Sequence, residues 1–401
     1  MNAQDPIIQR AQAVLTPNYR QAPLVLVRGE GSRVYDADGR EYLDCIAGIA
    51  TVALGHCNPA LVRALEDQAR TLWHVSNLFY NPRAVELAEA LVATTSWARR
   101  VFLCNSGAES NEAMLKLARK VHADQGHPER SEIVACENSF HGRTLFALSV
   151  TGQPKYHHGF EPLVPGVRFV PYGDADALAK ALGPRTAAFI VEPIQGEAGV
   201  MPAPDGYLAR ARELTRSAGA LLCFDEVQTG MGRTGRMWAH EREGVTPDLM
   251  SSAKALANGY PMGALLATEE AGVHLGPGSH ASTFGGNALG AAVAVAALRE
   301  IQRVLPEAER ISARLFERLR ALVTPDGRIA GVRGRGMLLG VLVRGVDAGE
   351  VVRVAREGGL LVNAIGTDVV RLAPALTLTA SEADLAVARL AVAVAAAPAR
   401  A

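Results

Sequence analysis

Val101-Phe102-Leu103-Cys104-Asn105-Ser106-Gly107-Ala108-Glu109-Ser110-Asn111-Glu112 is the stretch of sequence that decides the fold. Its first four residues form a short apolar run, which is typical of a buried strand. The chain then continues as a helix, because residues 114–121 carry apolar side chains on one face. A second apolar run, Ile133–Cys136, follows that helix. A strand, a helix and a strand in this order predict a parallel strand pair, and therefore an α/β fold.

Further apolar runs extend the same pattern along the middle of the chain. Each is a few residues long and is bounded by glycine, proline or polar residues, as buried strands are. They cover Ala187–Val191, Ala220–Phe224 and Gly263–Ala267. The sequence therefore predicts a mainly parallel central sheet that is covered by helices on both faces.

The two flanks of the chain differ from this pattern. Arg33–Asp36 and Glu41–Asp44 predict a hairpin with its turn around Asp38-Gly39. After about residue 290 an alanine-rich helix, a glycine-rich stretch and two αβ-like segments predict a smaller α+β domain. We therefore expect an N-terminal segment over residues 1–60 that packs on the small domain, a large domain over 61–290, and a C-terminal small domain over 291–401.

The composition of the 401 residues narrows the class of protein. Hydrophobic residues make up 49%, which excludes intrinsic disorder. The 41 lysines and arginines balance 41 acidic residues, which argues against nucleic-acid or membrane-surface binding. The five cysteines form no CxxC pair, and no histidine pattern such as HExxH occurs, so neither a disulfide framework nor a metal site is expected. Because we see neither a secretory signal sequence nor a segment that could span a membrane, we expect a cytoplasmic protein.

The segment that follows the first strand suits an anion. Backbone N–H groups at a helix N-terminus bind negative charge, and Gly107 allows a phosphate to approach the chain closely. Ser106 adds a hydroxyl donor. The alternative is an ordinary helix cap, in which Ser106 caps the helix and Glu109 completes a capping box.

Two further residues carry chemistry in positions where such side chains are unusual. Asp225 follows the strand Leu221–Phe224, where open α/β sheets bind ligands, although it could simply cap the next loop. Lys254 sits among small and apolar residues, and burial would free its amine as a nucleophile. The alternative is a surface lysine whose stem covers apolar neighbours.

Taken together, these residues form a set that suits pyridoxal 5'-phosphate. A phosphate cradle comes first, then an acid to keep a pyridine nitrogen protonated, and 29 residues later a lysine to hold an aldehyde. Phe140 could stack on the ring. The stretch Gly230–Gly235 matches GxGxxG, but it lies mid-chain without the acid spacing of a dinucleotide site, so we interpret it as a flexible loop that borders the site.

The chain closely resembles the class III pyridoxal-phosphate-dependent aminotransferases of fold type I, from about Tyr19 to Ala391. Within that class it is most similar to the enzymes that act on acetylornithine in arginine biosynthesis. The stretches that carry the resemblance are Gly55–Pro59, Leu72–Asn77, Phe140–Thr144, Val191–Glu197, Phe224–Gln228, Ser252–Leu256 and Ser282–Asn287. Small departures occur at Ser110, Ala198 and Ala257-Asn258.

The resemblance implies a role for each matching position. Lys254 and Asp225 would be catalytic: the lysine would hold the cofactor and move the substrate proton, and the acid would pair with the ring nitrogen. The implied cofactor-binding residues are Ser106, Gly107, Ala108, Phe140, Asp225, Val227, Gln228, Lys254 and Thr283. The implied substrate-binding residues are Arg143, Ser282, Arg371 and Glu197, in which Glu197 would be an acid that can neutralise an arginine. Thr283 would reach the neighbouring subunit's cofactor, so a homodimer with shared active sites is expected.

The implied reaction transfers the terminal amine of N2-acetyl-L-ornithine to 2-oxoglutarate, which gives N-acetyl-L-glutamate 5-semialdehyde and L-glutamate. Alternatives within the class are ornithine, succinylornithine, succinyldiaminopimelate or 4-aminobutyrate as the donor, or a lysine carried on an acidic carrier protein. Outside it, the same fold could host a decarboxylase, an aminomutase or a relative that has lost its cofactor.

Overall fold

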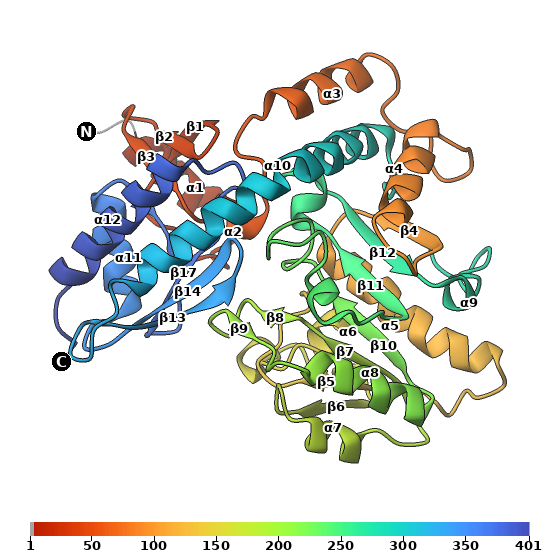
Figure 1. The fold of residues 1–401 in the computed structure, drawn as a ribbon. Helices are drawn as coiled ribbons and strands as arrows, with labels where there is room; N and C mark the ends of the chain where they lie inside the picture. The colour runs from red at the N-terminus through yellow and green to blue at the C-terminus, as the bar shows by residue number, and fades with distance from the viewer. Residues whose placement is uncertain (1–3, 401) are drawn as a thin grey trace.

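A seven-stranded sheet forms the centre of the molecule in the computed structural model, which describes residues 4–400 (Figure 1). The strand order is β4-β12-β11-β10-β7-β5-β6. These strands are β4 (Arg100–Cys104), β5 (Glu132–Cys136), β6 (Val167–Val170), β7 (Thr186–Val191), β10 (Leu221–Asp225), β11 (Leu249–Ser252) and β12 (Gly263–Ala267).

All neighbouring strands from β11 to β6 run parallel, and β12 is antiparallel to both of its neighbours, β11 and β4. The predicted fold class, a mainly parallel α/β sheet, is confirmed. The sequence did not predict β6 and β11. The pattern of β11, Leu249-Met250-Ser251-Ser252, is half polar although all four residues are buried.

Both faces of this sheet are covered, as the unbroken apolar runs predict. In β5, Ile133 and Ala135 join the apolar cluster under α5 (Gly107–Asp124), whereas Val134 and Cys136 join the cluster on the opposite face. That opposite face packs against α4 (Pro82–Ala93), α7 (Ala175–Ala181) and α8 (Tyr207–Ala218). The shorter helices of this part are α3 (Pro59–Ala69), α6 (Leu145–Ser149) and α9 (Glu269–Gly272), with 3-10 turns at Pro154–Tyr156, Ala239–Glu243 and Lys254–Ala257.

A second body lies beside the large sheet and combines both ends of the chain (Figure 1). The hairpin expected near the N-terminus is present, and its second strand pairs in parallel with a strand from the C-terminal part. This sheet has the order β1-β2-β3-β15, with β1 (Leu26–Glu30), β2 (Arg33–Asp36), β3 (Glu41–Asp44) and β15 (Leu360–Leu361).

A separate C-terminal sheet carries the order β13-β14-β17-β16. Its strands are β13 (Ile329–Arg335), β14 (Leu338–Val343), β16 (Asn363–Ile365) and β17 (Val369–Leu372). It packs with α11 (Ala348–Glu357), which packs in turn with α12 (Ala380–Ala396). The long helix α10 (Ala288–Arg320) contacts α3 and α4 of the large part as well as α12. The domain boundaries at residues 60 and 290 stay a prediction.

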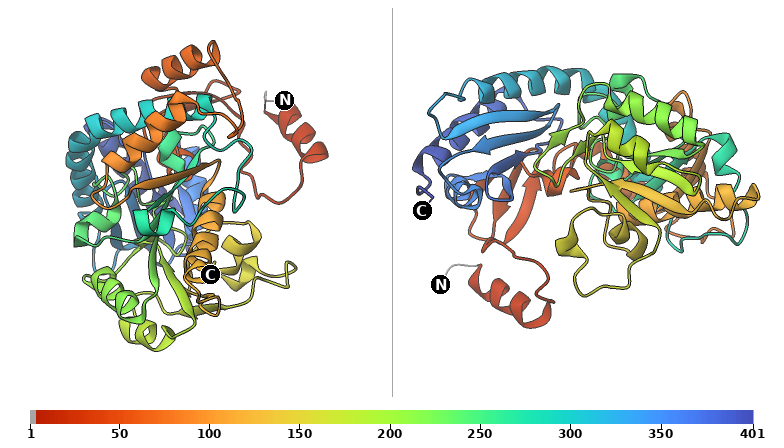
Figure 2. Two further views of the ribbon diagram at one scale, coloured as in Figure 1. Left: turned by 90° about the vertical axis from the view of Figure 1, so that its right-hand side faces the viewer. Right: turned by 90° about the horizontal axis from the view of Figure 1, so that it is seen from below.

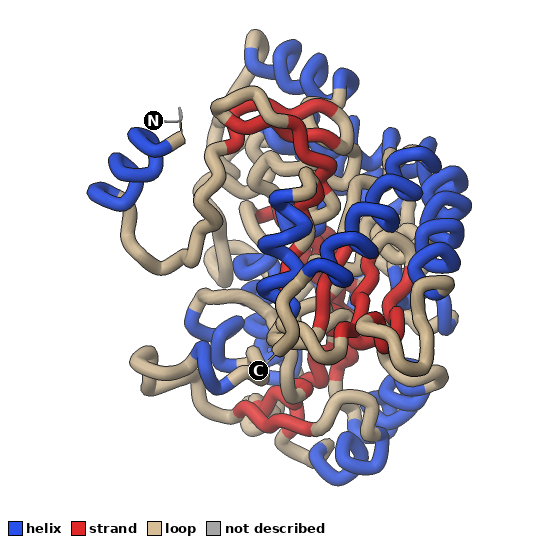
Figure 3. The backbone as a smooth tube through the Cα atoms, turned by 90° about the vertical axis from the view of Figure 1, so that its left-hand side faces the viewer, coloured by secondary structure: helices blue, strands red, loops and turns tan. Residues whose placement is uncertain are grey.

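Three smaller features complete the fold. The helix α1 (Asp5–Val14) has no buried residue and stands away from the body of the molecule (Figures 2 and 3). A small hairpin joins β8 (Ile194–Gln195) to β9 (Met201–Pro202). None of the helices within residues 4–400 is both long and apolar enough to cross a membrane.

A left-handed turn, labelled α2 (Ala47–Ala50), lies where the N-terminal segment meets the large sheet. All four of its residues have positive φ, from 48° at Ala47 to 62° at Ala50. Such a backbone is costly for residues other than glycine, and most of all for the β-branched Ile49. The carboxylate of Asp44 secures its start by accepting hydrogen bonds from the N–H groups of Ile46 and Ala47 at 2.8 and 2.9 Å.

We predict that Gly263→Ala destabilises the protein by about 1–3 kcal/mol, the usual cost of overpacking a buried site. A Cβ at position 263 would lie 2.8 Å from the Cys104 sulfur and would collide with the Ser106 carbonyl oxygen. Chemical denaturation measures the loss. The matched control is Gly276→Ala, because nothing lies within 4 Å of a Cβ there. Equal stability of the two variants would contradict the prediction.

Candidate active site

The carboxyl ends of the parallel strands meet at one edge of the large sheet, and the residues that follow them line a common cavity of about 380 Å³. Ser106 follows β4, Phe140 follows β5, and Glu192 follows β7, while Asp225 ends β10 and Lys254 is the second residue after β11. The predicted site residues that line this cavity are Ser106, Gly107, Ala108, Phe140, Arg143, Glu197, Asp225, Val227, Gln228 and Lys254.

The carboxylate of Asp225 is buried and held by four hydrogen-bond donors. Its Oδ2 accepts from Asn111 Nδ2 at 2.7 Å and from His141 Nδ1 at 2.8 Å. Its Oδ1 accepts from the N–H of Val227 at 3.0 Å and from Ser251 Oγ at 3.4 Å. These contacts fix the carboxylate in one orientation while its residue still lines the cavity. Sequence analysis missed Asn111 and His141, although both lie inside stretches that it quoted.

The amine of Lys254 lies in a desolvated part of the site. Burial lowers the pKa of the Lys254 amine to about 8, because an ammonium ion loses its hydration there, and the nearby Glu197 carboxylate opposes this effect only in part. The residue has φ 46°, a left-handed backbone that is unusual for a side chain of this size. The lowered pKa leaves a far greater fraction of neutral amine at physiological pH than an ordinary lysine has, as a nucleophile or a base requires.

The N-terminus of α5 is both a capped helix end and an open anion site. Ser106 Oγ accepts from the N–H of Glu109 at 3.2 Å, and the Glu109 carboxylate accepts from the N–H of Asn105 at 2.8 Å. The two interpretations of this segment are therefore compatible. The N–H groups of Gly107 and Ala108 are in the first turn, where a helix leaves its donors without internal partners. They face the cavity with the positive end of the helix dipole behind them.

Gly107 is needed at this helix start because of close packing. A Cβ at position 107 would lie 2.6 Å from Cγ1 of Val227. Any side chain here would push Val227, and with it the loop after Asp225, away from the helix. The N-terminus of α5 and the strand that ends at Asp225 are thus held in contact.

Phe140 and Arg143 lie at the mouth of the cavity. The N–H of Phe140 donates to the Glu192 carboxylate at 3.1 Å, which fixes the start of this loop. The Arg143 guanidinium stacks over the ring of Tyr156, 3.8 Å from its centroid, and is exposed. It has no carboxylate within 4.0 Å among residues 4–400, so it can take an acidic group of a ligand.

A second arginine, Arg371 in β17, is not itself among the residues that line the cavity, but it lies behind Glu197 and Gln228, which are, and Glu197 already compensates its charge. Its Nη1 donates to Glu197 Oε1 at 2.5 Å and to Gln228 Oε1 at 3.4 Å, and its Nε donates to Asn363 at 3.1 Å. Burial alone would raise the pKa of the Glu197 carboxyl, but the Arg371 guanidinium outweighs burial and lowers this pKa. The pair is therefore ionised at neutral pH.

Glu192 is a cavity carboxyl to which sequence analysis gave no role. It follows β7 and lies beside Asp225, because Val191 and Phe224 are partners in the parallel ladder. Burial, reinforced by the negative charge of Asp225, raises the pKa of the Glu192 carboxyl well above its usual range. In the sequence, the only indication of a role for Glu192 is its position directly after a predicted buried strand.

Besides Arg371, two predicted site residues do not line the cavity of this chain. Ser282 Oγ accepts hydrogen bonds from Asn105 Nδ2 and from the N–H of Gly285, both at 3.0 Å, and Thr283 next to it is exposed. They reach the site only through Asn105, which lines it. The resemblance assigns Thr283 to the cavity of a neighbouring subunit.

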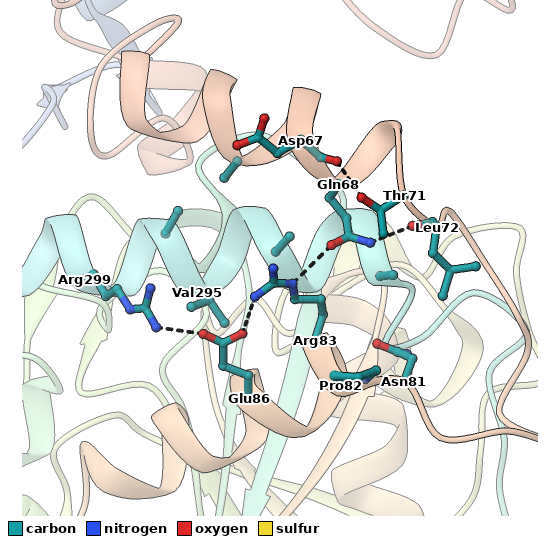
Figure 4. Close-up of a pocket in the computed structure, with 14 residues that line it drawn as sticks. Asp67, Gln68, Thr71, Leu72, Asn81, Pro82, Arg83, Glu86, Val295 and Arg299 are labelled. Atoms are coloured by element: carbon teal, nitrogen blue, oxygen red, sulfur yellow. Dashed lines mark hydrogen bonds and ion pairs between the residues drawn. The ribbon is translucent and has the colours of Figure 1, made fainter.

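A second large cavity, of about 590 Å³, lies between α3, α4 and α10 (Figure 4). Its charged groups neutralise one another in a chain, because Glu86 accepts from both Arg83 and Arg299 at 2.7 Å. Arg83 Nε also donates to Gln68 at 3.1 Å. The arginines of this cavity are thus already paired, whereas the site around Lys254 combines a buried amine with an oriented carboxylate, so we assign the chemistry to that site.

The residues around Lys254 suit a phosphorylated, cationic pyridine aldehyde. Free backbone N–H groups and Ser106 fit the phosphate, the oriented Asp225 carboxylate fits a protonated ring nitrogen, and the desolvated Lys254 amine fits the aldehyde. His141 Nε2 and Asn111 Oδ1 are buried and have no hydrogen-bond partner among the described residues. The two side chains that hold Asp225 therefore each keep one polar atom without a partner.

Comparison with known proteins agrees with this chemistry. The family model described as aminotransferase class-III matches residues 14–394. A curated acetylornithine aminotransferase of Myxococcus xanthus is 52% identical over 386 residues, which is 95% of each chain.

Solved structures give the same result. An N-acetylornithine aminotransferase from Stenotrophomonas maltophilia K279a is 40% identical with a TM-score of 0.84, over 97% of this chain and 98% of that one. An ornithine aminotransferase from Toxoplasma gondii ME49 is 36% identical with a TM-score of 0.95, over 99% of this chain and 96% of that one.

We predict that Lys254 of the cofactor-free protein reacts with trinitrobenzenesulfonate in a fast phase whose pH midpoint is about 8. Only the neutral amine reacts, and the lowered pKa makes it available below the range of an ordinary lysine, whose pKa is about 10.4. Lys254→Met should abolish the phase, and Lys180→Met on the exposed end of α7 should not. A midpoint above pH 10 would contradict the prediction.

Proposed function

This chain belongs to the class III aminotransferases, and from that membership we propose that it transfers the terminal amine of N2-acetyl-L-ornithine to 2-oxoglutarate. The observation that carries the proposal is the contrast between its two arginines. Arg371 is closed by Glu197, whereas Arg143 at the mouth is open to a carboxylate. The donor has a single carboxylate, far from its reacting amine, and needs only the position that is always available. The acceptor has two carboxylates and also needs the second position, which can be opened or closed.

Enzymes of this family depend on pyridoxal 5'-phosphate, which supplies an electron sink for the bond that is broken at the amine-bearing carbon. We propose that Ser106, Gly107 and Ala108 bind its phosphate, with Thr283 of a second subunit. Phe140 and Val227 would contact its ring, Asp225 would keep the ring nitrogen protonated, and Gln228 would lie near the ring hydroxyl.

Lys254 would act twice on this basis. Its Nζ would hold the aldehyde group of the cofactor in the resting enzyme. When the substrate amine takes that place, Nζ would be the base that moves the proton of the amine-bearing carbon, because its desolvated surroundings lower its pKa.

Arg143 would bind the α-carboxylate of acetylornithine, at the far end from the reacting amine, with Ser282 of a second subunit nearby. The guanidinium is a planar fork that pairs with a carboxylate through two hydrogen bonds, which fixes orientation as well as affinity. During this half-reaction Glu197 would compensate the charge of Arg371, so that no unpaired charge faces the carbon chain that carries the amine.

In the second half-reaction 2-oxoglutarate brings a carboxylate next to its reacting carbon. We propose that Glu197 then leaves Arg371, which binds that carboxylate. The side chain of Glu197 is 25% exposed whereas that of Arg371 is 2% exposed, so the acid is the partner with room to move.

We also propose that the enzyme is a homodimer. Trp73, Leu78, Phe79, Tyr80 and Phe284 are large apolar side chains that are 61–98% exposed. They flank Ser282 and Thr283, and exposed apolar patches of this kind mark interfaces. Sedimentation of the purified protein as a monomer would contradict this assembly.

The proposed location is the cytoplasm and the proposed pathway is arginine biosynthesis. All five cysteines are free thiols, as is usual in a reducing compartment. Growth of an arginine auxotroph that lacks acetylornithine aminotransferase tests the pathway, and failure of the gene to restore growth would contradict it.

The proposed reaction predicts a clear order in a panel of amino donors assayed with 2-oxoglutarate. Acetylornithine should have a kcat/KM at least about tenfold above that of ornithine or 4-aminobutyrate, since these lack the acyl group or the α-carboxylate. Succinylornithine and a carrier-linked lysine complete the panel. A preference for the carrier-linked lysine would replace the proposal with a lysine-pathway role, and product formation without 2-oxoglutarate would indicate a decarboxylase or an aminomutase.

We predict that the variants Arg143→Ala and Glu197→Gln change different half-reactions. Arg143→Ala should raise the KM for acetylornithine about tenfold or more, because a charge-assisted pair is lost. Glu197→Gln should increase the rate of the half-reaction with glutamate relative to that with acetylornithine, because a neutral amide no longer holds Arg371.

Single-turnover absorbance changes of the cofactor measure both half-reactions. Glu213→Gln, which alters an exposed pair with Arg210 on α8, is the control and should behave as the wild type. An unchanged ratio of the two rates in Glu197→Gln would show that this acid does not gate Arg371.

A further inference from the structure

Arg233 is a completely buried cation that the proposed chemistry does not use. It lies in the stretch Gly230–Gly235, which sequence analysis interpreted as a flexible loop that borders the site. The loop is there, but Met231, Arg233 and Thr234 are at most 1% exposed, so it is part of the interior.

The Arg233 guanidinium has only carbonyl oxygens as partners. Its Nη1 donates to the carbonyls of Pro374 and, at 3.3 Å, of Met337, while Nη2 donates to the carbonyl of Ala50 at 3.5 Å. No carboxylate oxygen lies within 4.0 Å of it among residues 4–400. Burial alone lowers the pKa of Arg233 to about 10, with no opposing charge to raise it.

A buried charge without a counter-ion is expensive, so its position calls for an explanation. The three carbonyls come from three segments that are far apart in the sequence and that each hold part of the site. Ala50 ends the left-handed turn next to Thr51, which lines the cavity. Pro374 follows β17, the strand of Arg371. Met337 lies in the turn before β14, which pairs with β17.

The loop of Arg233 is in turn fixed to the catalytic strand. It follows Asp225 along the chain through Gln228 and Thr229, and both of these line the cavity. The backbone carbonyl of Arg233 accepts a hydrogen bond from the N–H of Met337 at 2.9 Å. The contact is so close that a Cβ on Gly336 would collide with the backbone of Thr234 and Gly235.

We propose that Arg233 is a positioning residue that sets the distance from Arg371 to Lys254 and Asp225, by tying the end of β17 and the turn at Ala50 to the loop after β10. The inference rests on the proposed role of Arg371 as the carboxylate clamp. Arg233 would not touch either substrate, and it would act on the acceptor half-reaction, in which Arg371 binds.

The guanidinium suits this task and an ammonium does not. Its planar fork presents donors in several fixed directions, whereas a lysine presents one compact charge on a flexible stem. The contact with Ala50 is the longest of the three. The hydrogen bond to the Pro374 carbonyl, just after β17, is therefore the strongest of these contacts. Arg371 lies in β17, so it is the site residue that depends on this contact most.

The test compares Arg233→Lys with the wild-type holoenzyme. Glutarate, a dicarboxylate without the reacting keto group, is titrated calorimetrically to report the clamp without turnover. We expect its Kd to rise about tenfold, as loss of a well-placed charged pair predicts. The single-turnover rate with glutamate at fixed concentration should fall by a similar factor, and the rate with acetylornithine should stay within about twofold.

Arg236→Lys, on the exposed end of the same loop, is the matched control and should change none of these quantities. Unchanged glutarate binding in a folded Arg233→Lys variant would overturn the proposal. So would equal loss of both half-reactions, because a purely structural role weakens the whole site.

A second variant, Gly336→Ala, disturbs the same junction from the side of the small domain and should also weaken glutarate binding selectively. If neither variant folds, Arg233 serves stability alone and the proposal fails. A wild-type enzyme that neither binds glutarate nor reacts with glutamate would instead refute the proposed function, so the two failures are distinguishable.

Discussion

The parallel alignment of β4, β5, β7, β10 and β11 is the constraint on which the site depends, because it brings five carboxyl ends to one edge of the sheet. β12 is antiparallel to both neighbours, so it joins β11 to β4 and leaves these two strands pointing in the same direction. The helix start of α5 therefore lies beside the strand ends that carry Asp225 and Lys254. Gly263 in β12 allows this close approach at the Ser106 carbonyl, and Gly107 allows it at Val227.

Desolvation gives these residues their chemistry, and it acts differently on each of them. It lowers the pKa of the Lys254 amine, which becomes more reactive, and raises the pKa of the Glu192 carboxyl beside Asp225. Asp225 has four hydrogen-bond donors that stabilise its charge where burial would oppose it. Glu197 relies on Arg371 for the same purpose. Burial and the nearest charges thus shift the pKa of the Glu192 carboxyl and that of the Glu197 carboxyl in opposite directions.

Local sequence predicted much of this arrangement because the strands are short, apolar and buried on both faces. The expected strand over 263–267 has the observed bounds, and most others differ by about one residue. β11 was missed because Ser251 and Ser252 look polar, and only the tertiary structure shows that both are buried. Asn111 and His141 were missed for a related reason. Each is an ordinary polar residue until the fold brings Asp225 to it from more than 80 positions away. The pairing of β15 with β3 likewise depends on a contact that no local pattern encodes.

The junction between the small domain and the large sheet illustrates why directional bonds matter in such a site. Apolar burial holds surfaces together, but it has little directional preference and cannot by itself fix where a guanidinium sits relative to an amine. The chain instead uses N–H and carbonyl groups here. Between its two ends, Ala373 donates to Cys45 at 2.8 Å and Leu376 to Ala53 at 2.6 Å, and across the junction Met337 donates to Arg233 at 2.9 Å. The left-handed turn at Ala47–Ala50 is a strained backbone, and strain of this kind persists only where its surroundings over-determine it. Asp44 at one end of the turn and Arg233 at the other supply those surroundings, so the position of the turn is set by polar contacts at both ends.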